Sequence, residues 1–555
     1  MDRKGIIQFL KSFVRQQRSE VNYGTYRETN RTSLLNDGLG TRANSVWKQS
    51  QFVVAYRNDD ETSDYSGSYL KGWAELTRGI FDQYLILECP KSVWTVYDKN
   101  GNKMDLESLK NVPQKEIKES VRVHKSYFTI DKDANKHLSY LTALRTKPFM
   151  LLAGISGTGK SRIVRKLAQA TVTEELQRAN GYTGEDFVND RWTLHSPANF
   201  ELIQVKPNWH NSMDVIGYLS NIPSPHYVFT PFIEFIVKAW QHPEVPFFLC
   251  LDEMNLAPVE EYFAEFLSAI ESRSFEGEEY LTDPIIKPFN SFGEEVAKKM
   301  VNTLFPNFTA ADKNSFLGKI VDHLETKGLT LPKNLIVIGT VNMDETTFSF
   351  SRKVLDRAMS VEMNEVNYDS FLTDTTDDDL KAIVQAFEEN GDANLNALLV
   401  DRHIEAREII DELGDDAKFA IDYLKRINAL LEGTPFKLGY RAANEALIYL
   451  QASYEFGQTD RIAALDNFTL MKILSRIEGD ETKLKITDSE ADKERIAKAE
   501  VNVDEAKQYG DLNILTALRH IITNQLGGQD KLHSVKKIDS MLSQLKRDHF
   551  VSFWN

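Results

Sequence analysis

The sequence predicts an α/β core with a parallel sheet and flanking helices, followed by an α-helical region and preceded by a separate α+β domain. From Pro148 onward, short apolar runs alternate with longer helical patterns, which is typical of a parallel sheet with crossover helices. Beyond about residue 366 the strand pattern fades and acidic runs punctuate helical patterns. The 555 residues leave room for the three domains that we expect at 1–135, 136–365 and 366–555.

The N-terminal domain opens with an amphipathic helical pattern over residues 6–14 and continues with strand-like segments rich in Val, Ile, Tyr and Trp. These segments are Gln51–Tyr56, Tyr84–Cys89 and Ser92–Asp98. In the first 50 residues, nine basic residues stand against four acidic ones. The aromatic residues of this domain could stack on an extruded base or belong to an ordinary core. They are Tyr23, Tyr26, Trp47, Trp73 and Trp94.

The composition excludes several classes of protein. Hydrophobic residues make up 42% and charged residues 27%, which is typical of a soluble globular protein rather than a disordered one. No apolar run approaches the roughly 20 residues that span a bilayer, so we expect no membrane segment and a cytoplasmic location. The net charge of −16 means that any contact with DNA must be local. Cys89 and Cys250 are too few for a disulfide framework, and Cys250 lies in an apolar run where we expect a buried thiol.

Four apolar runs are the strand candidates of the core: Phe149–Ala153, Leu202–Lys206, Phe247–Leu251 and Leu335–Thr340. The first leads directly into the string Gly-Ile-Ser-Gly-Thr-Gly-Lys-Ser over residues 154–161, and a helical pattern follows at 163–170. This strand, loop and helix are the context that a P-loop requires. Its backbone amides and lysine bind phosphates, while its hydroxyl faces Mg²⁺. The expected nucleotide-binding residues are Gly154, Ser156, Gly157, Thr158, Gly159, Lys160, Ser161 and Arg162.

The third strand candidate ends abruptly in two carboxylates, Asp252 and Glu253. We expect Asp252 to share Mg²⁺ with Ser161, and Glu253 to polarise the water that attacks the γ-phosphate. A hydrophobic run before Asp-Glu is common by itself. Here the run follows a P-loop, and one further strand candidate lies between them. This order makes the run a specific indication of phosphoryl chemistry.

Two further catalytic candidates follow the fourth strand candidate. Asn342 ends that strand and could orient the attacking water. Arg357 closes a short helical stretch and could act as an arginine finger on the γ-phosphate of a neighbouring subunit. Arg352 competes with Arg357 for this role, and a surface salt bridge is the ordinary alternative for either.

With these motifs in order, the chain resembles the AAA+ family of P-loop NTPases from about residue 135 to the C-terminus. Three strings resemble its McrB-type, dynein-related branch: Val205–Trp209 with Asp214–Tyr218, Asp252–Phe263, and Gly339–Thr347. The string Leu438–Glu445 resembles the sensor-2 helix of the lid. That likeness implies that Arg441 reaches the γ-phosphate from the same subunit. Lys472–Gly479 and Phe550–Trp554 also recur in that branch.

The resemblance implies an NTP-hydrolysing motor that assembles into a hexameric ring, with ATP or GTP and Mg²⁺ as cofactors. The best-known McrB proteins use GTP and carry Met-Asn-Thr-Ala-Asp-Arg-Ser after the sensor strand. The corresponding run here, at 341–347, is Val-Asn-Met-Asp-Glu-Thr-Thr, so ATP is the first expectation. The resemblance also implies a separate McrC-type nuclease partner and contact with DNA through the N-terminal domain or the ring pore, in restriction or phage defence.

Two alternatives from other classes stay open. A chaperone-like remodeller of protein complexes is implied by the related MoxR and dynein branches. A nucleotide-gated binding scaffold would use hydrolysis only to reset its assembly. The sequence itself shows no metal-nuclease pattern in a strand context, since matches such as Glu116-Ile-Lys118 are isolated.

Overall fold

The computed structural model describes residues 136–276, 279–343, 348–364, 378–389, 395–458, 460–527 and 531–554, together with four short strands between residues 71 and 104. The chain forms two compact units. The first comprises Met1–Lys132, Ala382–Leu395 and Tyr454–Thr459. The second comprises Asp133–Lys381, Asn396–Ser453 and Asp460–Asn555, and it holds both the parallel sheet and the C-terminal helices.

The first unit contains a four-stranded antiparallel sheet in the order β1-β2-β3-β4. Its strands are β1 (Lys71–Glu75), β2 (Tyr84–Glu88), β3 (Thr95–Tyr97) and β4 (Lys103–Met104). The expected strands at Tyr84–Cys89 and Ser92–Asp98 are confirmed. The expected helix over residues 6–14, the strand Gln51–Tyr56 and the aromatic residues Tyr23, Tyr26, Trp47 and Trp94 lie outside the described residues.

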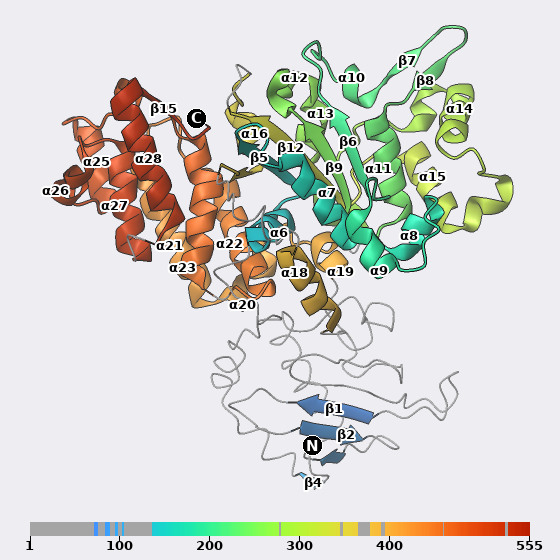
Figure 1. Cartoon of the computed structure of the whole chain (residues 1–555), viewed down its shortest axis with the longest axis horizontal. Coiled ribbons are helices and arrows are strands. Elements are labelled where there is room, and N and C mark those ends of the chain that lie inside the picture. Colours follow the sequence, from blue (N-terminus) through green and yellow to red (C-terminus); the bar gives the residue numbers. More distant parts are fainter. Residues whose placement is uncertain are drawn as a thin grey trace. The chain divides into compact units, whose positions relative to one another are not determined.

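The second unit is built on a five-stranded parallel sheet in the order β13-β5-β12-β9-β6 (Figure 1). The strands are β5 (Phe149–Gly154), β6 (Phe200–Gln204), β9 (Phe247–Asp252), β12 (Leu335–Asn342) and β13 (Met359–Glu362). Every residue of β5 and β12 is buried, as expected for central parallel strands covered on both faces. All four strand candidates are confirmed, and β13 is an additional strand.

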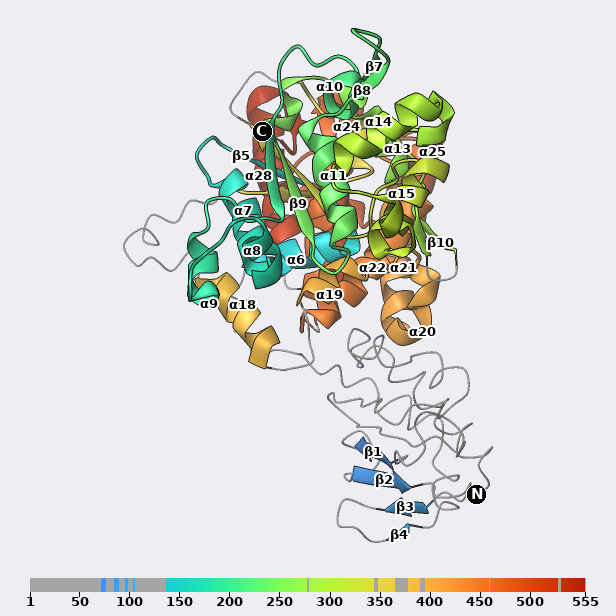
Figure 2. The same ribbon diagram turned by 90° about the vertical axis from the view of Figure 1, so that its right-hand side faces the viewer.

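Helices from the same unit pack on this sheet. Helix α7 (Lys160–Thr171) packs on β5, β12 and β9, while α11 (Pro231–Gln241) lies alongside β9 and β6 (Figures 1 and 2). Helix α6 (Lys136–Thr146) packs on β5 and β13. Phenylalanine rings fill part of this core, and Phe149 meets Phe266 edge-on with ring centroids 5.5 Å apart. These contacts confirm the α/β core with flanking helices.

The α/β part also carries two antiparallel hairpins and two peripheral helices. The hairpins are β7 (Tyr218–Ser220) with β8 (His226–Val228), and β10 (Ser274–Glu276) with β11 (Glu279–Leu281). The helices are α14 (Glu294–Leu304) and α15 (Phe316–Thr326). Helix α13 (Ala264–Ala269) follows the acidic strand, and α16 (Arg352–Leu355) lies between β12 and β13.

The C-terminal region is helical, as expected. Its longer helices are α21 (Asp415–Leu430), α22 (Tyr440–Glu455), α23 (Arg461–Phe468), α25 (Glu490–Lys498), α27 (Ile514–Leu526) and α28 (His533–Asp548). A small antiparallel pair joins β14 (Glu478–Asp480) to β15 (Phe550–Ser552). Among the helices that the structure describes, none has the length and apolar character needed to cross a membrane.

Candidate active site

The carboxyl edge of the parallel sheet gathers the residues expected to act on phosphate. The register pairs Asn342, at the end of β12, with Gly154, at the end of β5. On the other side of β12 lies β9, which ends at Asp252. Parallel strands end at the same edge, so the phosphate loop, the acidic pair and the Asn342 amide meet there.

The loop between β5 and α7 has the backbone shape of an anion cradle. Gly157 and Gly159 both have φ of +83°, a region that glycine adopts without steric cost. Gly159 directly precedes the first residue of α7, so the unpaired amides of this helix face the loop. The Thr158 hydroxyl donates to the Ile155 carbonyl at 3.0 Å, while Ser156 and Arg162 are exposed at the rim.

Lys160 is buried, with 6% of its surface exposed. Its Nζ donates to the carbonyl oxygens of Gly154 and Ile155, both at 2.8 Å. Gly154 has no room for a side chain, because a Cβ there would lie 2.5 Å from the Met363 carbonyl oxygen. The Gly154–Ile155 peptide therefore lies between the Lys160 ammonium group and the residue that follows β13, in close contact with both.

Asp252 is held by two hydroxyl groups. Ser161 Oγ and Thr340 Oγ1 donate to the same carboxylate oxygen, Asp252 Oδ1, at 2.6 and 2.7 Å. Thr340 Oγ1 in turn accepts the backbone N–H of Glu253 at 2.9 Å. A single buried threonine thus fixes the position of both acidic residues.

Glu253 and Asn342 are joined directly. Asn342 Nδ2 donates to Glu253 Oε1 at 3.0 Å. Glu253 has a left-handed backbone with φ of +53°, which is unfavourable for a residue with a side chain and is often found at functional sites. Asn342 is 9% exposed, so this contact orients the Glu253 carboxylate at the end of its strand.

Thr340 is a site residue that no sequence motif indicated. It lies two residues before Asn342 on the same strand, so the two side chains share one face of the sheet. That spacing was the available indication, but threonine is also an ordinary β-strand residue.

The donor set fits a hydrated magnesium ion carried by a nucleotide. Mg²⁺ in phosphate sites takes one or two protein oxygens and completes its shell with phosphates and water. Asp252 and Ser161 supply a carboxylate and a hydroxyl oxygen within hydrogen-bonding distance of each other. Beneath them, Cys250 is a fully buried free thiol whose pKa is raised by burial, as expected for an inert core residue.

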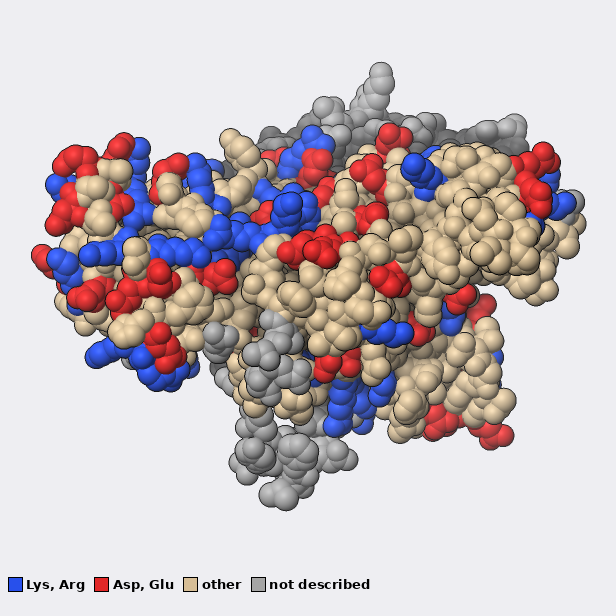
Figure 3. Space-filling view, turned by 90° about the horizontal axis from the view of Figure 1, so that it is seen from above, with Lys and Arg blue, Asp and Glu red and all other residues tan. Residues whose placement is uncertain are grey.

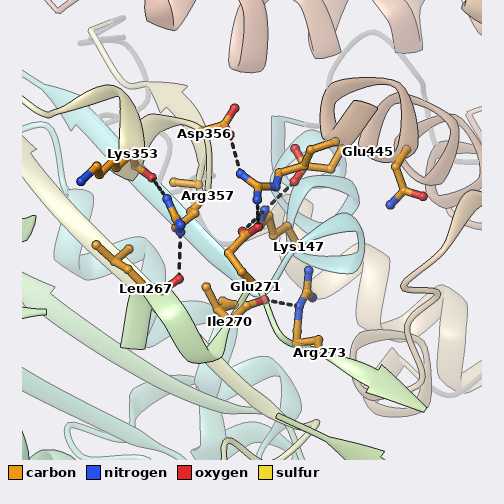
Figure 4. Close-up of polar contacts among 12 residues, drawn as sticks. Lys147, Leu267, Ile270, Glu271, Arg273, Lys353, Asp356, Arg357 and Glu445 are labelled. Carbon is orange, nitrogen blue, oxygen red and sulfur yellow. Dashed lines mark hydrogen bonds and ion pairs between the residues drawn. The ribbon is translucent and has the colours of Figure 1, made fainter. Parts of the chain in front are cut away.

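Arg357 lies away from this carboxyl edge. Its Nε donates to the Leu267 carbonyl and its Nη1 to the Lys353 carbonyl, each at 2.8 Å (Figure 4). These bonds attach the guanidinium to α13 and α16. Arg352, the competing candidate, lies over the ring of Phe436, with its Cζ 5.4 Å from the ring centroid.

The structure does not bring Arg441 to the phosphate loop of its own chain. Arg441 forms ion pairs with Glu271 and Asp356, and Glu271 also pairs with Lys147 at 3.2 Å. Lys147 precedes β5 at the amino edge of the sheet, whereas Gly154 ends β5 at the carboxyl edge. At roughly 3.3 Å per residue the two edges are about 20 Å apart. The expected contact with a γ-phosphate on the same chain is therefore not formed, because α22 approaches the sheet at its opposite edge.

Beside Arg441, a buried ionic network joins the sheet to the C-terminal helices. Glu445 accepts from Lys147 with one carboxylate oxygen (Figure 4). Its other oxygen pairs with Lys472 Nζ at 2.7 Å. All three side chains are at most 5% exposed. Burial alone raises the pKa of Glu445, but the attraction of Lys147 and Lys472 outweighs burial and lowers it from 4.5 to about 2. Glu445 is thus a permanently charged anchor between two lysines.

Comparison with known proteins finds one family. Residues 405–550 match a family described as a domain of unknown function, DUF8727. No curated protein matches the chain. The matched segment lies within the C-terminal helical region and includes Arg441, Glu445 and Lys472, but none of the residues at the carboxyl edge of the sheet.

Proposed function

We propose that the protein hydrolyses a nucleoside triphosphate, ATP in the first instance and GTP as the alternative, as an AAA+ motor of the McrB type. The observation that carries this proposal is the connected set of side chains at the carboxyl edge of the sheet. The hydroxyl groups of Ser161 and Thr340 donate to the same oxygen of Asp252. Beside them, the Asn342 amide donates to the Glu253 carboxylate. The strand that bears Asn342 lies between the phosphate-loop strand and the acidic strand.

The phosphate loop and the acidic residues at this edge of the sheet have the roles that phosphoryl transfer requires. The loop amides and Lys160 bind the β- and γ-phosphates and stabilise the charge that develops on them. Ser161 and Asp252 would hold Mg²⁺, which neutralises phosphate charge. Glu253 accepts a proton from the attacking water, and Asn342 keeps the Glu253 carboxylate turned toward the phosphate.

We propose that neighbouring subunits complete the site in a hexameric ring. Arg357 lies on the α13 and α16 side of the subunit and is the finger candidate for the next subunit's γ-phosphate. Arg441 shares this side, because it pairs with Asp356, the residue before Arg357. We therefore propose that Arg441 serves the neighbouring nucleotide rather than its own.

The proposed biological role is to drive a separate McrC-type nuclease on DNA in restriction or phage defence. Support comes from the sequence strings that resemble this branch and from the absence of a metal-nuclease pattern in the sequence. Lys and Arg side chains also gather over the C-terminal helices, interspersed with Asp and Glu, so local basic surface is not confined to the first 50 residues (Figure 3). A local surface of this kind suits contact with DNA phosphates.

The decisive test separates nucleotide binding from hydrolysis. Lys160→Ala should abolish binding of a fluorescent ATP or GTP analogue, whereas Glu253→Gln should bind normally and lose phosphate release by about 100-fold or more. Glu261→Gln, an exposed carboxylate on the same segment, serves as the matched control. Near wild-type hydrolysis by Glu253→Gln would refute the proposed site. Stimulation of turnover by DNA would favour the motor over the protein-remodelling alternative, and the purified chain should leave DNA intact.

A further inference from the structure

Three side chains connect the phosphate loop to the C-terminal helix α28. The Ile155 backbone N–H, inside the loop, donates to Asn364 Oδ1 at 3.1 Å. Asn364 Nδ2 donates to Glu362 Oε1 at 2.6 Å. The other oxygen of Glu362 pairs with Lys537 Nζ of α28 at 2.8 Å. The chain of contacts thus runs from the loop, through the end of β13, to the helical region.

The ion pair between Lys537 and Glu362 is largely shielded from solvent. The side chains of Lys537 and Glu362 are 10% and 20% exposed, so water competes little for their ion pair. Lys537 Nζ also lies 4.5 Å from the ring centroid of Phe553, which is fully buried. Phe553 directly follows β15, so Lys537 joins the loop contact to the packed C-terminal segment.

At the phosphate loop, Asn364 bonds to the Gly154–Ile155 peptide, which also bonds to Lys160. Lys160 Nζ donates to the carbonyls of Gly154 and Ile155, while Asn364 accepts the Ile155 N–H. A phosphate bound in the loop would compete for the same ammonium group. Any movement of the Gly154–Ile155 peptide therefore displaces Asn364 directly, and Glu362 and Lys537 through Asn364.

We infer that Asn364, Glu362 and Lys537 form a latch that positions the phosphate loop and transmits its nucleotide-dependent change to α28. Lys537 is a positioning residue, since it acts on the loop only through Glu362 and Asn364. Lys537 belongs to the segment that matches the domain of unknown function, and the latch gives that segment a task. The transmission half rests on the proposed nucleotide site, whereas the positioning half concerns the protein without nucleotide.

The positioning half is tested by amide hydrogen exchange on the full-length protein without nucleotide. Lys537→Met keeps the apolar stem over Phe553 and removes the ammonium, and Lys537→Arg retains the charge. Lys536→Met, an exposed neighbour on α28, is the matched control. Lys537→Met should raise exchange in the loop, residues 153–160, by about threefold to tenfold, as expected for loss of one sheltered ion pair. Lys537→Arg and Lys536→Met should resemble wild type.

The transmission half, in which nucleotide binding at the loop alters α28, is tested by adding Mg-ATP or Mg-GTP to the same variants. In wild type, nucleotide should change exchange in α28, residues 533–548, and Lys537→Met should lose this response. Its nucleotide affinity should fall by about threefold to tenfold, with recovery in Lys537→Arg. The double variant Glu362→Gln with Lys537→Met should lower nucleotide affinity no more than the more damaging single variant does. Both substitutions remove the same ion pair, so their effects should not add.

The outcomes separate the latch from the proposed function. Loop exchange and nucleotide affinity in Lys537→Met equal to those of Lys536→Met would overturn the latch. Raised exchange throughout α27 and the β14–β15 pair would also overturn it, since that pattern indicates general loosening of the helical region. If wild type bound neither nucleotide, the proposed function and the transmission half would fail. The positioning half would still be decided by loop exchange without nucleotide.

Discussion

Thr340 is the residue on which both acidic groups of the candidate site depend. Its hydroxyl donates to Asp252 and accepts from the Glu253 amide, and the side chain is 2% exposed. Replacement by valine keeps the shape and removes both bonds. A buried amide left without an acceptor costs about 1–3 kcal/mol, and the Glu253 carboxylate loses its fixed position.

Thr340→Val should therefore lower the hydrolysis rate by about tenfold to 100-fold, since each 1.4 kcal/mol lost from transition-state stabilisation is a factor of ten. Thr340→Ser should retain most activity. Steady-state phosphate release, with binding measured separately, provides the test. Thr142→Val is a suitable control because its buried hydroxyl donates to the Leu138 carbonyl within α6, away from the acidic residues. Full activity in Thr340→Val would show that the hydroxyl does not position Glu253.

At the scale of elements, β12 and the turn after β9 are packed without spare volume. A Cβ on Gly339 would lie 2.3 Å from Met254 Sδ and 3.1 Å from Leu151 Cδ2. Met254 directly follows Glu253, so any shift of Met254 also moves the turn that bears Glu253. Gly339→Ala should destabilise the fold by about 1–3 kcal/mol through overpacking and should reduce hydrolysis as well.

Shortening the neighbouring side chain tests whether crowding is the cause. Met254→Ala combined with Gly339→Ala should recover part of the stability lost in Gly339→Ala alone, as measured by urea denaturation. Strictly additive losses would indicate that the two residues do not compete for space.

The ion network around Glu445 makes a second prediction at this scale. Glu445→Gln removes the buried carboxylate that Lys147 and Lys472 share, although Lys147 keeps its ion pair with Glu271. Loss of one partner of a buried ion pair typically costs about 3–5 kcal/mol. Urea denaturation near neutral pH measures the loss. Glu432→Gln, which removes an exposed partner of Lys437, should cost less than about 1 kcal/mol. Similar losses in both variants would contradict a special role for the buried network.

The pH dependence of this difference has a defined sign. The pKa of Glu445 is about 2 in the folded protein and 4.5 ordinarily, so the unfolded chain binds its proton first as the pH falls. The stability that Glu445 contributes is present above pH 4.5 and is lost toward pH 2. The gap in unfolding free energy between wild type and Glu445→Gln should thus narrow as the pH falls from 4.5 toward 2. A gap that did not narrow over this acidic range would contradict the lowered pKa of Glu445.

Sequence patterns predicted the elements of the sheet better than the arrangement of the arginines. Long apolar runs identified β5, β9 and β12, but β13 has only four residues, Met-Ser-Val-Glu, and carries no such pattern. Motif spacing placed Lys160, Ser161, Asp252, Glu253 and Asn342 correctly at one edge, since each belongs to a strand end or the loop after it. Arg441 belongs to a helix far along the chain, and local pattern does not reveal which edge of the sheet that helix approaches.

For the whole molecule, the central prediction is a site shared between subunits. Arg357→Ala should lose about 100-fold or more in hydrolysis while keeping nucleotide affinity, and Lys160→Ala should be inactive. Mixed in equal amounts, the two chains should regain activity, because about a quarter of randomly formed interfaces combine an intact loop with an intact finger. Phosphate release as a function of mixing ratio is the measurement. Full activity of Arg357→Ala alone, with no gain on mixing, would exclude Arg357 as the finger.

The buried triad of Lys147, Glu445 and Lys472 also constrains how this protein can diverge over generations. Loss of Glu445 leaves two buried lysines without the carboxylate between them, and loss of either lysine removes one of the two charges that stabilise the buried Glu445, so an intermediate with a single change is selected against. Descendant sequences should therefore either retain all three ionic residues or replace them together with apolar ones. Positions 147 and 472, separated by more than half of the chain, should accordingly covary through position 445.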